Sequence, residues 1–351
     1  MNSTWLEQAC LTLNNNAHSQ ATEHQMQLTK PPGALGKLEH IAIQLAAMQN
    51  KKLPEINTVQ ITVFAADHGI ANQGVSAFPQ AVTVEMIKNF SRGGAAINVL
   101  ARANNATLDV VNLGTAYPAE NLKGVIDKSI ADGTKDFSQQ PAMSETECMT
   151  ALSVGAELID QAADRQSDLF IAGEMGIANT SSATAIACAL LERPAEDLAG
   201  PGTGLDNAGV AKKAGIINQS LSLHKLTKDD ALKILETFGG FEIAAITGSY
   251  IRCAQLGIPV LVDGFICSVA ALVASRIKPG VTSWFLYAHA SAEPGHQIIM
   301  QALNATPIVD LGMRLGEGSG AAVAIPLIKS ACALHSQMAT FAEAGVSEKN
   351  E

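Results

Sequence analysis

The sequence is poor in aromatic residues and in charge, and it has no run of basic side chains. Only 4% of its 351 residues are aromatic and 16% are charged, and the formal net charge is −10. A nucleic-acid-binding protein needs a basic surface, and net acidity disfavours anionic membrane surfaces. We therefore expect neither nucleic acid nor a membrane as a partner. A small phosphorylated substrate fits, because backbone amides and one or two local cations can hold a phosphate.

The sequence also lacks paired cysteines and an uninterrupted long apolar run. Its six cysteines are scattered without a CxxC pair, which indicates buried free thiols in a reducing compartment. The segment Met1–Cys10 is polar and does not resemble a signal peptide. The longest apolar run, Ile258–Ala274, contains Asp263 and Gly264, so we expect a strand and a helix rather than a membrane span. These features predict a cytoplasmic protein.

Strand-like and helical segments alternate through the middle of the chain. Hydrophobic residues make up 47% of the sequence, which predicts a large buried core. The predicted strands are Val59–Ala65, Leu108–Leu113, Leu169–Ala172, Pro259–Val262, Trp284–Tyr287 and Ile308–Leu311. The predicted helices between them include Thr83–Arg102, Asp230–Phe238 and Phe241–Leu256. This alternation predicts an α/β fold with a doubly wound, mainly parallel six-stranded sheet and helices on both faces.

Both ends of the chain are predicted to be helical. Leu38, Ile41, Leu45 and Met48 recur at spacings of three and four residues, which indicates one buried helix face. The Ala-rich segment from Ser319 to Glu343 is also helical in pattern. Pro326 lies inside this segment, and we expect it to bend the helix or to split it in two.

Glu317 is the first candidate for chemistry, because ligands bind beyond the carboxyl ends of parallel strands and a helix follows this residue. Gly316 and Gly318 flank it, which lets a substrate approach the backbone closely and leaves the carboxylate unshielded. The amides at the start of the helix could also hold an anion. The residues alone fit a catalytic carboxylate, and they equally fit a flexible turn with an exposed glutamate.

Two further carboxylates follow predicted strands. Glu174 lies between Gly173 and Gly176, ahead of a helix whose start is rich in hydroxyl groups. That arrangement resembles a phosphate cradle with a carboxylate beside it, although an ordinary capped strand–helix turn is the alternative. Asp263 ends an apolar strand and fits either a contact with ribose hydroxyls or a loop anchor.

Histidines and acidic residues in other loops give a competing hypothesis. The residues concerned are Asp67, His68, His289, Ser291, Glu293 and His296. They loosely resemble a metal-ligand set, but they lack the HExxH spacing and also fit polar loop or substrate contacts. The glycine-rich segment Gly200–Gly204 lacks the GxGxxG spacing, and we expect a mobile or substrate-covering loop there. GxSxG and Walker A motifs are absent from the sequence.

Seven segments, in order along the chain, resemble the nicotinate-nucleotide:dimethylbenzimidazole phosphoribosyltransferase family, which assembles the lower ligand of cobalamin. They are Lys30–Glu39 (KPPGALGKLE), Ala66–Ile70 (ADHGI), Gly173–Thr180 (GEMGIANT), Gly202–Asp206 (GTGLD), Val262–Phe265 (VDGF), His289–Glu293 (HASAE) and Met313–Gly320 (MRLGEGSG). Each segment alone is a weak signal, whereas seven in this order are highly specific and cover nearly the whole chain.

The resemblance implies transfer of the phosphoribosyl group from nicotinate mononucleotide to 5,6-dimethylbenzimidazole. The products are α-ribazole 5′-phosphate and nicotinate, with inversion at the anomeric carbon and with no cofactor or metal. Glu317 is implied as the catalytic base that takes the ring proton. On this chemistry we expect a ribose or leaving-ring contact from Glu174, with Asp263 as a candidate for the ribose hydroxyls, and phosphate contacts from Gly176, Ser291 and the amides around Gly318. The expected walls for the flat base are Pro32, Phe78, Met86, Met175 and Leu315.

The resemblance also implies a homodimer with its site near the interface, and a small helical domain built from both termini. The small domain would contain residues 1–50 and 326–351, and the catalytic domain residues 51–325. Phe78 and Pro201 stand where relatives carry other residues, which leaves the preferred base open. The alternatives are a paralogue that uses phenolic or other benzimidazole bases, a metal-dependent hydrolase, and a catalytically silent nucleotide sensor.

Overall fold

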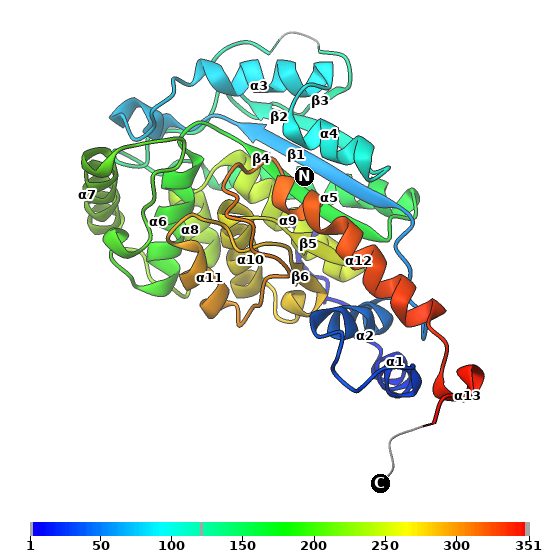
Figure 1. Ribbon diagram of the computed structural model, residues 1–351. Helices are drawn as coiled ribbons and strands as arrows, with labels where there is room; N and C mark the ends of the chain where they lie inside the picture. The colour runs from blue at the N-terminus through cyan, green and yellow to red at the C-terminus, as the bar shows by residue number, and fades with distance from the viewer. Residues whose placement is uncertain (1–2, 120–121, 348–351) are drawn as a thin grey trace.

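The computed structural model describes residues 3–119 and 122–347, which contain a six-stranded sheet with helices on both faces (Figure 1). The strands are β1 (Val59–Ala66), β2 (Thr107–Gly114), β3 (Val125–Asp127), β4 (Leu169–Met175), β5 (Val260–Val262) and β6 (Phe285–Tyr287). Their order is β3-β2-β1-β4-β5-β6, and each neighbouring pair is parallel. The predicted α/β fold is confirmed. The chain order reverses between β1 and β4, the position where open sheets of this kind bind ligands.

The described residues also form α-helices along the whole chain. They are α1 (Asn15–Gln27), α2 (Lys37–Gln49), α3 (Ala81–Arg92), α4 (Ala96–Ala103), α5 (Glu145–Asp164), α6 (Asn179–Leu191), α7 (Asn207–His224), α8 (Ala231–Phe238), α9 (Phe241–Leu256), α10 (Phe265–Ile277), α11 (His296–Ala302), α12 (Ser319–Gln337) and α13 (Phe341–Ala344). Helices α9 and α10 pack on one face, and α3, α4 and α12 on the other (Figure 1). Every residue of β1 is buried, as expected for a strand covered on both sides.

One predicted strand is wrong and one observed strand was not predicted. Ile308–Leu311 forms only an isolated bridge, between Val309 and His289, and Leu311 is exposed. This apolar segment crosses beyond the end of β6 instead of joining the sheet. The strand that was not predicted is β3, which pairs with β2 at the edge of the sheet. It has only three residues, none of them buried, so it carries no alternation of apolar and polar side chains.

The helix predicted over Thr83–Arg102 is also wrong, because two helices occupy this range. Helix α3 is capped by Gly93, whose φ of +80° lies in the left-handed region that glycine adopts without strain. Helix α4 begins after Ala95. Pro326 does not split the last long helix, since α12 continues without interruption from Ser319 to Gln337.

The terminal helices α1, α2 and α13 lie together at one end of the molecule, where α12 reaches them (Figure 1). Ile41, Leu45 and Met48 of α2 are buried, which confirms the helix face predicted from their spacing. The predicted small domain includes residues 1–2 and 348–351, which lie outside the described residues. All six cysteines are free thiols, as predicted, but only five are buried as expected, because Cys10 is partly exposed. Among the described residues, none of the helices is both long and apolar enough to cross a membrane.

Candidate active site

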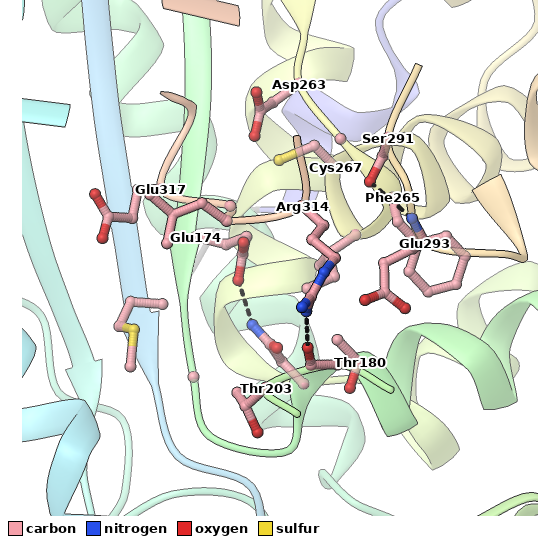
Figure 2. Close-up of a pocket in the computed structure, with 18 of the residues that line it drawn as sticks. Glu174, Thr180, Thr203, Asp263, Phe265, Cys267, Ser291, Glu293, Arg314 and Glu317 are labelled. Atoms are coloured by element: carbon pink, nitrogen blue, oxygen red, sulfur yellow. Dashed lines mark hydrogen bonds between the residues drawn. The ribbon is translucent and has the colours of Figure 1, made fainter. Parts of the chain in front are cut away.

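A cavity opens at the carboxyl ends of β4, β5 and β6 (Figure 2). Its walls come from the segments that follow these strands, from α3, and from the loop before α12. The lining residues are Val82, Met86, Glu174, Met175, Gly176, Ile177, Asn179, Thr180, Gly202, Thr203, Asp263, Gly264, Phe265, Ile266, Cys267, His289, Ser291, Glu293, Arg314, Leu315, Gly316 and Glu317. Five buried carboxyl or imidazole groups therefore meet in one cavity, those of Glu174, Asp263, His289, Glu293 and Glu317.

The backbone at Glu317 has an unusual conformation. Gly316, Glu317 and Gly318 have φ angles of +85°, +62° and +82°, so three consecutive residues lie in the left-handed region. This region is unfavourable for a residue with a side chain such as Glu317. The loop packs tightly on β4 and requires glycine there, because a Cβ atom on Gly173 would lie 2.2 Å from the Glu317 carbonyl oxygen. The tight loop turns the Glu317 side chain into the cavity wall.

The Glu317 carboxylate is buried and accepts a hydrogen bond from a helix. Its exposed fraction is 5%, and Oε2 accepts from the backbone N–H of Ile97 at 3.1 Å, in the first turn of α4. Burial raises the pKa of Glu317, the hydrogen bond from Ile97 opposes this, and the nearby charge of Asp263 adds to the rise. The group can therefore act as a carboxylate base whose proton affinity exceeds that of a solvated glutamate.

Glu174 lies beside Glu317 in the same wall but has a different environment. Its side chain points toward Asn179, whose amide donates a hydrogen bond to Oε2 (Figure 2). Burial raises the pKa of Glu174 to about 8, against the Asn179 hydrogen bond, and the charges of Glu242, Asp263 and Glu317 raise it further. At neutral pH this carboxyl group is mostly protonated and can donate a hydrogen bond.

Asp263 is directed at the start of α12. Its Oδ1 accepts from the backbone N–H of Ala321 at 2.7 Å, and the Gly318 N–H also contributes a hydrogen bond. The imidazole of His289 lies 3.7 Å from the same oxygen. Burial raises the pKa of Asp263, whereas His289 and these amides oppose the rise. The free amides of the helix thus point at a carboxylate of the protein.

One cation and a hydroxyl-bearing turn lie on another side of the cavity. Arg314 lines the cavity and donates to the Gly202 carbonyl oxygen at 2.9 Å. Lys213 does not line it, but its buried ammonium group donates to Thr180 Oγ1 at 2.8 Å and to the Gly200 carbonyl oxygen at 3.3 Å. Burial lowers the pKa of Lys213 to about 8, and Glu293 opposes this shift. In Figure 2, Glu174 lies between Glu317 and Arg314, and Glu293 lies on the same side as Arg314.

Comparisons with known proteins agree over nearly the whole chain. A family model described as "Phosphoribosyltransferase" matches residues 10–346. A relative from Pseudomonas putida KT2440, named nicotinate-nucleotide–dimethylbenzimidazole phosphoribosyltransferase, is 54% identical over 349 residues, 99% of each chain. This chain belongs to that phosphoribosyltransferase family.

Two more members of the family support the same assignment. A relative of the same name from Pseudomonas aeruginosa PAO1 is 53% identical and again covers 99% of each chain. The crystal structure of the nicotinate-nucleotide–dimethylbenzimidazole phosphoribosyltransferase from Thermus thermophilus superposes with a TM-score of 0.91 at 38% identity. That match covers 96% of this chain and 100% of the other. The fold and the enzyme class are therefore those of the family.

Most residues expected at the site from the sequence line the cavity. They are Glu317, Glu174, Gly176, Ser291, Asp263, Met86, Met175 and Leu315. Gly318 does not line it, because its backbone packs against Gly173 and its N–H is directed at Asp263. Pro32 and Phe78 also lie outside the lining residues, and both side chains are exposed. The roles of these three residues remain predictions.

Part of the loose metal-ligand set stays together, because His289, Ser291 and Glu293 all line the cavity. His68 is fully buried, with Nε2 2.7 Å from Glu242 Oε1 and Nδ1 2.9 Å from Ser182 Oγ. Burial lowers the pKa of His296 to about 4, and its Nδ1 accepts from the Ser291 N–H at 2.9 Å. Within residues 3–119 and 122–347, no three His, Cys, Asp or Glu side chains are grouped as metal ligands.

Sequence reasoning missed Arg314 in the cavity and Lys213 next to it. Arg314 stands in the same segment as Glu317 but was not considered for binding. Lys213 has no motif around it, and its neighbour Lys212 is exposed. Spacing could have identified it, because Lys213, Ile217 and Ser220 recur at intervals of four and three and form the buried face of α7. Thr180, Thr203 and Asn179 were also absent from the expected site.

Proposed function

We propose that this chain transfers the phosphoribosyl group of nicotinate mononucleotide to 5,6-dimethylbenzimidazole, as the names of its relatives state for those proteins. The observation that carries the proposal is the buried Glu317 carboxylate in the wall of the cavity. A neutral imidazole attacks with one nitrogen while the other carries a proton. Glu317 takes this proton, so that the product ring does not retain a positive charge.

The stereochemistry and the leaving group follow from the substrate. Attack on the anomeric carbon opposite the departing nicotinate inverts that centre and converts a β-nucleotide into an α-product. The pyridinium of the bound nucleotide already carries a positive charge, so its departure as neutral pyridine needs no proton. Ile97 holds Oε2 of Glu317. We therefore assign the ring proton to Oε1.

The phosphate of the nucleotide belongs, in this proposal, in the part of the cavity where Arg314 lies. Arg314, Thr180, Gly176 and Ser291 line the cavity, and the buried Lys213 donates to Thr180. Charge-assisted hydrogen bonds to phosphate are the strong ones in such sites. Protonated Glu174 contacts the ribose or the departing ring. Met86, Met175 and Leu315 contact the flat base.

The direct test is product formation without any auxiliary protein. We expect the enzyme, nicotinate mononucleotide and dimethylbenzimidazole to yield α-ribazole 5′-phosphate, detected by chromatography and mass spectrometry. Glu317→Gln keeps the acceptor for Ile97 but cannot take a proton, and its rate should fall by about 10²- to 10⁴-fold. Glu23→Gln, at an exposed glutamate of α1, is the matched control. Full activity of Glu317→Gln would refute the assigned role.

We propose further that the enzyme is a cytoplasmic homodimer, with residues 1–50 and 326–351 as the small domain. Because Pro32 does not line the cavity of its own chain, its role as a base wall requires a second copy. Light scattering tests the oligomeric state. Each of the alternative substrates (dimethylbenzimidazole, other benzimidazoles and phenol) must lose a proton to Glu317, so Glu317 cannot distinguish them. A competition assay with mixtures of these substrates tests which one the enzyme prefers.

A further inference from the structure

Thr83 forms an unusual pair of hydrogen bonds beneath the cavity. It lies in the first turn of α3, and its side chain is fully buried. Its hydroxyl donates to Asp67 Oδ1 at 2.6 Å and accepts from the backbone N–H of Ile177 at 3.1 Å. Helical threonines commonly turn this group back to a carbonyl of their own helix. Here the hydroxyl leaves the helix and joins the ends of β1 and β4.

The acceptor of this hydroxyl is firmly held. Asp67 directly follows β1 and is fully buried, and its Oδ2 accepts from the Ala116 N–H at 2.9 Å. A second bond ties the same helix end to the same strand end, because Gln80 Nε2 donates to the His68 carbonyl oxygen at 2.9 Å. The start of α3 is thereby fixed relative to the sheet. Thr83 cannot move without leaving buried polar groups unpaired.

The donor belongs to the turn that forms the floor of the cavity. Ile177 lies between Gly176, which lines the cavity, and Ala178, whose φ of +76° is strained for a residue with a Cβ atom. Val82 and Met86 of α3 line another wall. One hydroxyl group therefore sets the spacing between the turn after β4 and the wall formed by α3.

We propose that Thr83, oriented by Asp67, is a positioning residue that holds the Gly176–Ile177 turn in place to bind the phosphoribosyl donor. The inference rests on the proposed function, because that function places the phosphate at this turn. Thr83 touches neither substrate nor the reacting atoms, and it acts through the Ile177 amide. Its loss is expected to weaken binding of the nucleotide more than it slows the chemical step.

The experiment compares three variants by steady-state kinetics. Thr83→Val keeps the shape of the side chain and removes the hydroxyl, and we expect KM for nicotinate mononucleotide to rise about tenfold while kcat changes by less than about threefold. Thr83→Ser restores the hydroxyl and should return KM to within about twofold of the wild-type value. Thr247→Val is the matched control, because that buried hydroxyl donates to the carbonyl oxygens of Ile243 in α9 and Ala270 in α10, and Thr247 does not line the cavity.

A measurement that does not depend on turnover separates this inference from the proposed function. Amide hydrogen exchange of Ile177 should be slow in the wild-type protein and faster in Thr83→Val, whatever reaction the enzyme performs. If Thr83→Val does not fold, amide hydrogen exchange of Ile177 in the wild type and in Thr83→Ser still tests the inference. Rapid exchange at Ile177 in the wild type, or an unchanged KM in folded Thr83→Val, would overturn the inference. Absence of product from the wild type would instead refute the proposed function.

Discussion

The carboxylate of Glu317 and the backbone N–H of Ile97 form a hydrogen bond of 3.1 Å that joins the loop before α12 to the start of α4. A helix N-terminus stabilises negative charge, whereas burial of the carboxylate opposes it. Burial is the larger influence, and it leaves the pKa of Glu317 above the ordinary value of 4.5. The same bond fixes the direction of the side chain before any substrate is present.

The pH dependence of kcat/KM should therefore show a shifted acid limb, because this ratio reports the groups of the free enzyme. Only the deprotonated carboxylate can accept the ring proton, so the rate should fall as the pH drops through the raised pKa of Glu317. We expect the midpoint of this limb above pH 4.5, the ordinary value for glutamate. Product formation at limiting substrate, measured between about pH 4 and pH 8, checks it. A midpoint at or below 4.5 would contradict this environment for Glu317.

Glu174 should act as a neutral group at physiological pH. Since burial raises its pKa to about 8, deprotonation above that pH places a charge in the cavity. We expect KM for nicotinate mononucleotide to increase more steeply above pH 8 in the wild type than in Glu174→Gln, which mimics the neutral form. An identical pH profile for the two proteins would argue against a protonated Glu174.

The same shift predicts an effect on stability. For a carboxyl group with a raised pKa, the contribution to stability is full below 4.5 and is lost as the pH rises toward 8. Glu174→Gln should therefore raise Tm relative to the wild type more at pH 9 than at pH 5. Glu23→Gln, measured by the same thermal unfolding, should show no such trend.

Arg314 should contribute to the affinity for the nucleotide but not for the base. Its guanidinium lines the cavity, where a phosphate could accept charge-assisted hydrogen bonds from it. We expect Arg314→Gln to raise KM for nicotinate mononucleotide about 10- to 100-fold, with KM for dimethylbenzimidazole nearly unchanged. Arg193→Gln, at an exposed arginine on the surface, is the control. Equal increases in both KM values would disprove this division of the cavity.

Gly173→Ala should damage both stability and catalysis. The added Cβ atom would lie 2.2 Å from the Glu317 carbonyl oxygen, so the loop that orients Glu317 must shift. We expect a loss of about 1–3 kcal/mol in the free energy of unfolding, together with a lower kcat. Gly215→Ala is the contrasting variant, because its Cβ would meet nothing within 4 Å inside α7. It should be neutral or stabilising by about 0.5–1 kcal/mol, and chemical denaturation compares the two.

The fold could be predicted well where periodicity or burial is strong. The predicted helix Phe241–Leu256 coincides with α9, and the strand predicted from Val59 coincides with β1 to within one residue. The failures have local causes. The segment Ile308–Leu311 is apolar enough for a strand. It lies beside the residues that follow β6, and only Val309 forms a bridge, with His289. At β3, three residues that are not buried give too little pattern to detect.

The site was predictable mainly where glycines stand beside a charged residue. Glu174 and Glu317 were found in this way, and both line the cavity, although the strand predicted ahead of Glu317 is not formed. Thr180 and Thr203, which reach the cavity from the start of α6 and from the loop before α7, were not among the expected contacts. Local sequence does not show which side chains tertiary packing brings together. The Ala321 amide, which donates to Asp263, likewise depends on contact between segments far apart in the chain.

Helix α12 starts next to Glu317 and continues past Pro326 to Gln337, where it packs among the terminal helices. His335, near its end, is fully buried and hydrogen-bonds to Gln25 of α1. The carboxyl-terminal part of the chain is therefore no detachable appendage. A protein that ends at Pro326 would lose most of helix α12, whose first turn contains the Ala321 amide that donates to Asp263. Such a truncation should disturb the reaction centre from a distance, even though every cavity residue would still be present.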